Sequence, residues 1–128
     1  SYEDFMTSDQ LEDNYQASLV GQDTIQGRNC WILELNAVGE DVAYFRQQIW
    51  VDQSRFLVLK ANRYAKSGKL LKTTHVEEVF KVAGRWYPRK VVFKDELKQG
   101  KGTEFYIEEV EFNKKIPVYL FSKAALKK

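Results

Sequence analysis

The chain has 128 residues, of which 44% are hydrophobic and 14% aromatic, with two prolines and a formal net charge of +2. This length suits one domain over residues 1–128, and the composition excludes a disordered or collagen-like chain. The apolar runs are far shorter than the roughly 20 residues that a membrane-spanning helix needs, so we expect no membrane-spanning segment.

The N-terminal segment is acidic and starts with helix-capping residues. Residues 1–27 carry six acidic side chains and no lysine or arginine. Thr7 or Ser8 precedes polar helix formers, which predicts a short helix or turn over residues 7–12. Residues 1–4 do not combine basic and apolar stretches, so we expect that a secretion signal is absent from this sequence or was removed from it.

Alternation of apolar and polar side chains dominates the rest of the chain. Turn residues separate the alternating segments, and several turns offer Gly where positive φ is needed. Residues 66–69 (KSGK) lack the full spacing of a phosphate-binding loop and predict a hairpin turn. The pattern predicts a mainly β, antiparallel meander of about seven strands: 14–22, 28–37, 42–52, 55–65, 70–82, 86–97 and 102–112.

The C-terminal part of the chain carries a proline, a helix signal and a basic tail. Pro88 has no backbone N–H and is expected near a strand start or on a sheet edge. Ser122 suits an N-cap, and residues 120–126 predict one or two helical turns after a loop at 113–117. From Lys114 onwards the chain has five lysines and no acid. Such lysines either meet nucleic acid or anionic lipid, or protect an exposed sheet edge from aggregation.

Neither face of the predicted sheet is simply polar. On strand 55–65, Leu57 and Leu59 share one face, while Phe56 and Val58 lie on the other beside polar side chains. A strongly curved sheet with an apolar trough would cover both faces, and so would a tightly packed barrel or sandwich without a cavity. The pattern leaves both architectures open.

The sequence offers no residue arrangement typical of an enzyme. His75 is the only histidine, so the parts of a His/Cys metal site or a Ser-His-Asp triad are lacking. Glu109 and Glu111 share a strand face, but the abundant lysines and arginines favour cross-strand charge pairs. Cys30 is the only cysteine and lies in an apolar strand pattern, which favours a buried thiol. We expect a non-enzymatic protein without catalytic residues, cofactor or metal.

Several short motifs follow one another in a specific order. They are residues 49–52 (IWVD), Tyr64, 67–70 (SGKL), 72–73 (KT), 84–88 (GRWYP), 102–103 (GT), 112–113 (FN), 116–117 (IP) and 120–122 (LFS) with Leu126. In this order and spacing, the stretch 44–126 resembles the C-terminal part of the LolA-like outer membrane lipoprotein-sorting family. Residues 1–5 and Tyr15 look like the middle segment of that family.

This resemblance implies a half-open barrel of LolA/LolB type, whose apolar concave side accepts acyl chains. It implies a periplasmic carrier or chaperone for lipids or lipoproteins, acting in outer-membrane lipoprotein sorting or envelope lipid export, with an inner-membrane transporter as a further partner. Complete members are roughly twice as long, so we expect a C-terminal portion of a longer protein. The candidate lining residues are Trp31, Leu33, Leu35, Phe45, Ile49, Leu57, Leu59, Val91 and Phe93.

Two other functions compete with this hypothesis. In the first, the sheet is a non-enzymatic protein-interaction module of an envelope transport complex. In the second, aromatic and basic residues form an RNA-binding sheet, but the sequence has no RNP-like aromatic cluster, so we expect no nucleic-acid partner. Nucleic-acid binding should weaken steeply as salt rises, whereas acyl-chain binding should barely change.

Overall fold

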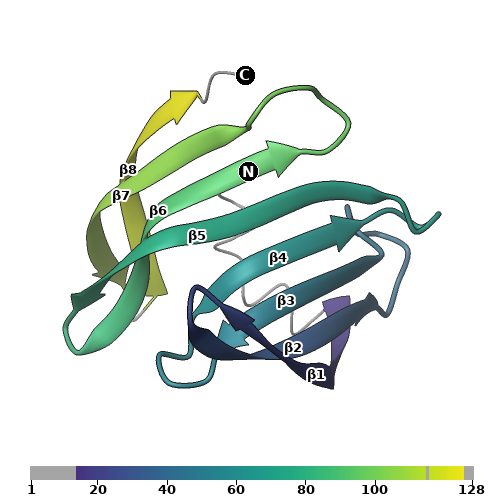
Figure 1. The fold of residues 1–128 in the computed structure, drawn as a ribbon, viewed down its shortest axis with the longest axis horizontal. Coiled ribbons are helices and arrows are strands. Elements are labelled where there is room, and N and C mark those ends of the chain that lie inside the picture. The colour runs from purple at the N-terminus through teal and green to yellow at the C-terminus, as the bar shows by residue number, and fades with distance from the viewer. Residues whose placement is uncertain (1–13, 115, 126–128) are drawn as a thin grey trace.

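The computed structural model describes residues 14–114 and 116–125, which form a single antiparallel sheet of eight strands. Each strand pairs with the next one along the chain, and within these residues β1 does not pair with β8, so the curved sheet stays open (Figure 1). The strands are β1 (Tyr15–Ile25), β2 (Arg28–Ala37), β3 (Arg46–Asp52), β4 (Val58–Tyr64), β5 (Leu70–Val82), β6 (Arg85–Asp95), β7 (Thr103–Asn113) and β8 (Ile116–Ala125).

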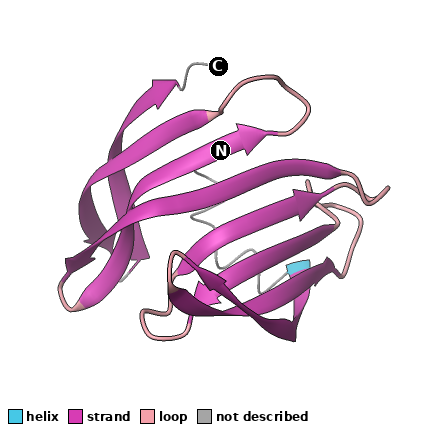
Figure 2. Ribbon diagram, in the orientation of Figure 1, coloured by secondary structure: helices cyan, strands magenta, loops and turns pink. Residues whose placement is uncertain are grey.

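The seven predicted strands are confirmed as β1 to β7, and the meander is confirmed with them. The helix predicted over residues 120–126 is wrong, because β8 continues as a strand through Ala125 (Figure 2). In β8, partly buried Tyr119 and Phe121 alternate with exposed Val118 and Leu120. This period of two, together with pairing to β7, outweighs the local capping signal of Ser122.

Two further predictions concern segments near the ends of the chain. The helix or turn predicted over residues 7–12 lies outside them. The loop predicted over residues 113–117 is much shorter, because β7 ends at Asn113 and β8 begins at Ile116. Within the described ranges, no helix has the length and apolar character needed to cross a bilayer.

The register of the sheet sorts side chains of six strands, β2 to β7, into two parallel rows. Because side chains alternate along a strand, each row marks one face of the sheet. We call the face with the first row the apolar face and the face with the second row the charged face. The first row is Leu33, Ile49, Ala61, Thr74, Phe93 and Thr103, and the second row is Ile32, Trp50, Lys60, His75, Val92 and Glu104.

The core lies in two clusters of buried side chains. Leu59, Val76, Val91 and Ile107, each at most 3% exposed, form the centre of the larger cluster. Cys30 also belongs to it and is fully buried, as predicted. The smaller cluster consists of Leu35, Ile49 and Ala61. The apolar side chains of the alternating segments therefore form a packed interior in the middle of the sheet.

The β1–β2 hairpin bends over the sheet. The side-chain amide Nε2 of Gln26, in the β1–β2 turn, donates to the carbonyl oxygen of Val76 in β5 at 3.2 Å. Three strand spacings, about 14 Å, would separate β2 from β5 in a flat sheet. A register shift between Val76 and Glu78 interrupts the β5–β6 ladder at this point. The hydrogen bond therefore requires the strong curvature visible in Figure 1.

Two sequence interpretations of local structure are confirmed. The KSGK segment is the β4–β5 turn, where the amide of Ala65 donates to the carbonyl of Lys69 at 2.9 Å and Gly68 has φ 91°. Pro88 lies opposite Val79 near the start of β6, whereas β6 pairs with β7 only from Lys90 onwards. The missing N–H of proline therefore falls where no β7 residue pairs with it.

Candidate functional site

A groove opens into the core at one end of the sheet, between the β3–β4 turn, the β5–β6 hairpin and the start of β8. Its volume is about 580 Å³, within the range of small-molecule sites. Leu57 lines the groove and also belongs to the larger core cluster, so the groove and the core are continuous. The lining residues are Ser54, Arg55, Phe56, Leu57, Lys81, Gly84, Arg85, Trp86, Tyr87, Pro117 and Tyr119.

Aromatic rings make one wall of this groove. The rings of Tyr87 and Tyr119 meet edge to face with centroids 6.1 Å apart, and Tyr87 meets Phe112 in the same way at 6.2 Å. Burial, and secondarily the neighbouring Tyr87, raises the pKa of Tyr119 to about 12. The wall is therefore an aromatic surface suited to an apolar ligand.

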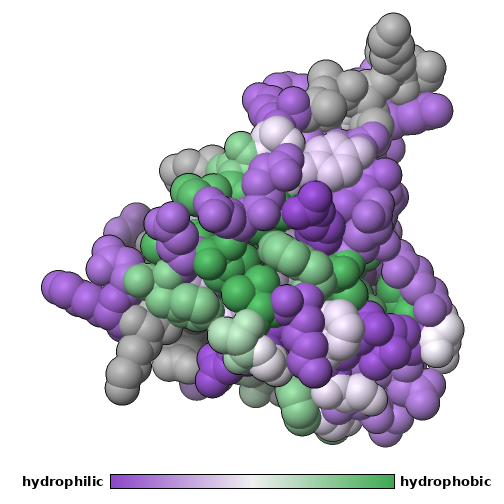
Figure 3. All heavy atoms as spheres, turned by 90° about the vertical axis from the view of Figure 1, so that its left-hand side faces the viewer, coloured by the Kyte–Doolittle hydropathy of each residue, from purple (hydrophilic) through white to green (hydrophobic). Residues whose placement is uncertain are grey.

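Cationic side chains surround the same groove. The guanidinium of Arg55 lies 4.2 Å from the centroid of the Trp86 ring, and the ammonium of Lys81 lies 5.6 Å from it. Arg85 lies on the same β5–β6 hairpin. Figure 3, which views the molecule from the left-hand side of Figure 1, shows hydrophobic residues gathered in the centre and hydrophilic ones around them. The surface there has an apolar middle and a polar rim.

A buried aspartate holds the β3–β4 turn that closes one side of the groove. Asp52 is 1% exposed, pairs with Arg28, and accepts hydrogen bonds from the amides of Ser54 at 2.8 Å and Arg55 at 3.1 Å. Burial alone would raise the pKa of Asp52, but Arg28 and the two amides outweigh it and hold the pKa below its ordinary value. The turn presents Phe56 at φ 54° with 74% of its surface exposed.

A second hollow of about 230 Å³ lies near the opposite ends of β5 to β8. The side chains of Phe93 and Phe105 line it together with five cationic residues and one carboxylate. We call it the basic pocket. Its lining residues are Arg63, Lys72, Thr73, Phe93, Lys94, Asp95, Lys98, Thr103, Phe105 and Lys123.

The structure distributes the nine predicted lining residues over several environments. Leu57 lines the groove and Phe93 lines the basic pocket. Trp31 packs against Phe56 with centroids 6.2 Å apart, and Phe45 lies 5.3 Å from the ammonium of Lys66. That these side chains contact a ligand stays a prediction. The other five, Leu33, Leu35, Ile49, Leu59 and Val91, pack in or against the two core clusters.

Sequence reasoning missed the aromatic wall and the basic pocket. The alternation across residues 118–121 could have identified Tyr119 as an inward-facing strand residue, but the capping signal of Ser122 obscured it. The pocket lysines could not be grouped, because they come from separate strands and turns. Among residues 14–114 and 116–125, no three His, Cys, Asp or Glu side chains gather in a way that could hold a metal ion.

Comparison with known proteins places the chain in a family. A family model described as "Uncharacterized protein" matches residues 1–128, and the chain belongs to that family. No curated protein matches the chain.

Solved structures share the fold. A LolA superfamily protein from Nitrosomonas europaea is 24% identical with a TM-score of 0.61, over 92% of this chain and 47% of that one. A DUF1329 family protein from Desulfovibrio piger ATCC 29098 is 29% identical with a TM-score of 0.68, over 80% and 41%. A domain described as that of a candidate outer membrane lipoprotein-sorting protein from Vibrio parahaemolyticus is 20% identical with a TM-score of 0.62, over 66% and 37%.

The chain therefore spans less than half the length of each of these three structures. The likeness confirms the resemblance found in the sequence at the level of the fold, since the open, curved antiparallel sheet is LolA-like.

Proposed function

We propose that this chain is part of a non-enzymatic periplasmic carrier or chaperone that binds acyl chains of lipids or lipoproteins. The fold supports a carrier of this kind, because an open sheet keeps part of its apolar interior accessible. Outer-membrane lipoprotein sorting or envelope lipid export is the process it would serve, with an inner-membrane transporter as a further partner.

The main observation behind the proposal is that the groove connects the larger core cluster with the surface. Leu57 belongs to both, and Tyr87 and Tyr119 extend the apolar surface outwards. An acyl chain needs apolar walls rather than reactive groups, since each methylene removed from water contributes about 0.8 kcal/mol. The charged ends of the cations around the groove would remain in water, while their methylene stems extend the apolar wall.

The proposal is tested by the binding of an uncharged apolar fluorophore, N-phenyl-1-naphthylamine, to the unmutated protein and to two variants. Tyr119 and Leu120 are neighbours in β8, but Tyr119 lines the groove while Leu120 is 39% exposed. Tyr119→Glu places a carboxylate in the groove wall and should abolish fluorophore binding. Leu120→Glu makes an equivalent charge change outside the groove and should leave binding unchanged.

Circular dichroism and thermal unfolding of both variants separate loss of binding from loss of fold. Equal binding by both variants, or no fluorophore binding by the unmutated protein, contradicts the carrier proposal.

A second candidate function follows from the edge of the sheet. Leu19 and Val20 of the edge strand β1 are 61% and 51% exposed beside a register shift. Exposed apolar residues on an edge strand favour association with another protein, as in a protein-interaction module of an envelope transport complex. This candidate predicts that the fluorophore is not bound, which the same titration measures.

A further inference from the structure

Most of the strand residues that line the basic pocket lie on the apolar face of the sheet. Lys72 in β5 is directly opposite Arg63 in β4, and Lys123 in β8 is directly opposite Phe105 in β7. The register alone therefore brings cations from three strands to one end of this face. Lys98, in the β6–β7 connection, completes the group.

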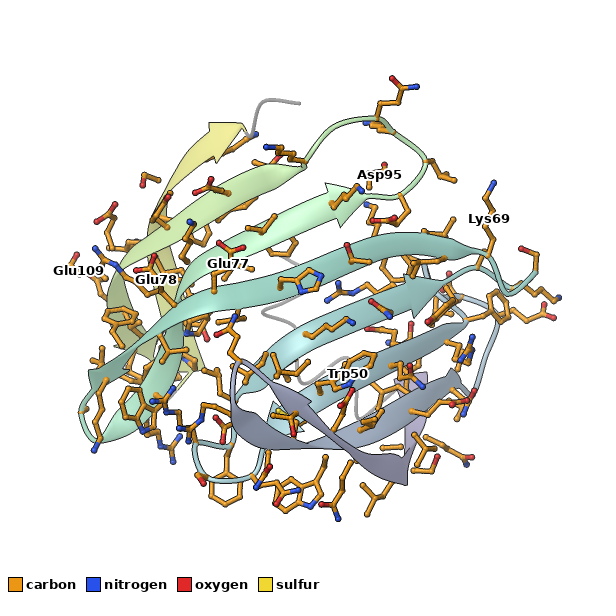
Figure 4. The ribbon with its side chains drawn as sticks, viewed as in Figure 1. Trp50, Lys69, Glu77, Glu78, Asp95 and Glu109 are labelled. Atoms are coloured by element: carbon orange, nitrogen blue, oxygen red, sulfur yellow. The ribbon has the colours of Figure 1, made fainter. Side chains whose placement is uncertain are left out.

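The one carboxylate of the pocket already has a structural role. An oxygen of the Asp95 side chain accepts a hydrogen bond from the amide of Leu97 at 3.0 Å, and the Asp95 carbonyl accepts one from the amide of Lys98 at 3.1 Å. Both bonds build the turn that follows β6. Figure 4 shows Asp95 at this end of β6.

The remaining charges are unevenly balanced. The ammonium of Lys94 lies 3.8 Å from the carboxylate of Glu96. In the described part of the chain, no carboxylate lies within 4.0 Å of the ammonium groups of Lys72, Lys98 or Lys123. Three lysines around one hollow attract an anion, because their mutual repulsion is relieved when it binds.

Aromatic rings connect the basic pocket to the core. Phe93 and Phe105 line the pocket and meet edge to face with centroids 5.0 Å apart, and Phe105 meets Phe121 at 5.9 Å. Phe93 and Phe121 also pack against the larger core cluster. An amphiphile could therefore place its chain along these rings and its charged group among the lysines.

We propose that the basic pocket binds the phosphate of an anionic lipid headgroup whose acyl chain starts along the rings of Phe93 and Phe105. This inference rests on the proposed carrier function and adds the class of lipid that the carrier prefers. Lys72, Lys98 and Lys123 bind the phosphate oxygens as point charges. Phe93 and Phe105 contact the first methylenes of the chain.

The test compares two amphiphiles with the same chain below their critical micelle concentrations, dodecyl phosphate and uncharged dodecyl maltoside. Isothermal titration calorimetry at low ionic strength measures the binding of each amphiphile directly, because the fluorophore reports on the groove and not on the basic pocket. We expect dodecyl phosphate to bind about tenfold more tightly, a ratio equivalent to about 1.4 kcal/mol. Added salt should reduce the ratio because it screens exposed charges.

Two double variants with equal charge changes assign the effect to the pocket. Lys98→Glu with Lys123→Glu alters two exposed pocket lysines and should remove the preference for phosphate while dodecyl maltoside still binds. Lys69→Glu with Lys114→Glu alters two exposed lysines outside the pocket and should retain the preference. Figure 4 places Lys69 at the end of the β4–β5 hairpin, and Lys69 is not among the residues that line the pocket. Circular dichroism checks the fold of each variant.

The outcomes separate this inference from the carrier proposal. Equal binding of the two amphiphiles, or equal loss of preference in both double variants, overturns the phosphate pocket and leaves the carrier proposal standing. Inorganic phosphate that binds as tightly as dodecyl phosphate assigns the pocket to a free anion and overturns the lipid headgroup. If neither amphiphile nor the fluorophore binds, the carrier proposal is wrong, and the inference that rests on it is wrong as well.

Discussion

The apolar and charged faces are built from the same strands but are stabilised in different ways. In β4, the buried side chains Leu59, Ala61 and Arg63 alternate with partly exposed Lys60 and Asn62. The apolar face gains its stability from close packing in the core clusters. The charged face also contributes Trp50 to the larger core cluster, but its polar side chains in β4 are partly exposed, and the ammonium of Lys60 lies over the Trp50 ring at 4.6 Å. A new charge should therefore be costly at the buried Leu59 and nearly neutral at its partly exposed neighbour Lys60.

The largest effect is expected from Leu59→Glu. Leu59 is 3% exposed in the larger core cluster, so the new carboxylate would be buried without a partner. We expect the free energy of unfolding to fall by more than about 4 kcal/mol, enough to unfold the chain.

The matched control is Lys60→Glu, the adjacent residue on the charged face. This substitution replaces a cation–π contact by a partly exposed carboxylate. It should lower the free energy of unfolding by about 1 kcal/mol or less. Urea unfolding of both variants makes the comparison, and similar losses would show that the two faces are not distinct.

The second largest effect is expected at Gly102, where β6 and β7 approach each other closely. Gly102 precedes β7 with φ +99°, and a Cβ added there would lie 2.4 Å from the carbonyl oxygen of Phe93. Gly102→Ala combines backbone strain with a clash and should reduce the free energy of unfolding by about 2 to 5 kcal/mol.

Gly39→Ala is the control, because nothing lies within 4 Å of its added Cβ. Thermal unfolding measures both variants, and a Gly102→Ala protein as stable as the Gly39→Ala protein would contradict the close approach of β6 and β7.

The third effect tests the turn beside the groove. Asp52→Ala removes the carboxylate that pairs with Arg28 and accepts hydrogen bonds from two backbone amides. It should lower the free energy of unfolding by about 1 to 3 kcal/mol. Because the folded-state pKa of Asp52 lies below its ordinary value of 3.8, its stabilising contribution is present above pH 3.8 and is lost as pH falls through the folded-state pKa.

Unfolding curves between pH 7 and pH 2 should therefore converge for the unmutated and Asp52→Ala proteins at the acidic end. A constant difference over this range would contradict the ionised pair.

Sequence patterns predicted the strands well because alternation and glycine turns are local signals. β1 to β7 and the β4–β5 turn follow directly from them. β8 was mispredicted because its strand character depends on pairing with β7 and on the inward positions of Tyr119 and Phe121. Local capping propensity carries no information on either.

The candidate site was less predictable than the fold. Alternation grouped Leu57 with Leu59, but only curvature decides that Leu57 reaches the groove while Leu59 stays in the core. The basic pocket depends on the registers of three strand pairs and on the turn after Asp95. Register between distant segments is a tertiary property that one sequence does not reveal.

The smallest effect is expected at His75, an exposed residue of the charged face. Partial desolvation of the ring and then the nearby ammonium of Lys60 lower the pKa of His75 below its ordinary value of 6.5, while Glu77 and Glu96 act to raise it. The resulting contribution to stability is present above pH 6.5 and is lost as pH falls through the folded-state pKa. Since the side chain is exposed, this loss should be small.

The single histidine of the chain gives one imidazole signal to follow by NMR titration. Lys60→Gln removes the cation in the row next to His75 and should move its pKa up towards 6.5. Lys69→Gln makes the same change in net charge at the exposed β4–β5 turn, outside the interactions that shift His75, and should leave the pKa unchanged. An equal response to both substitutions would mean that net charge, rather than the Lys60 contact on the charged face, sets this pKa.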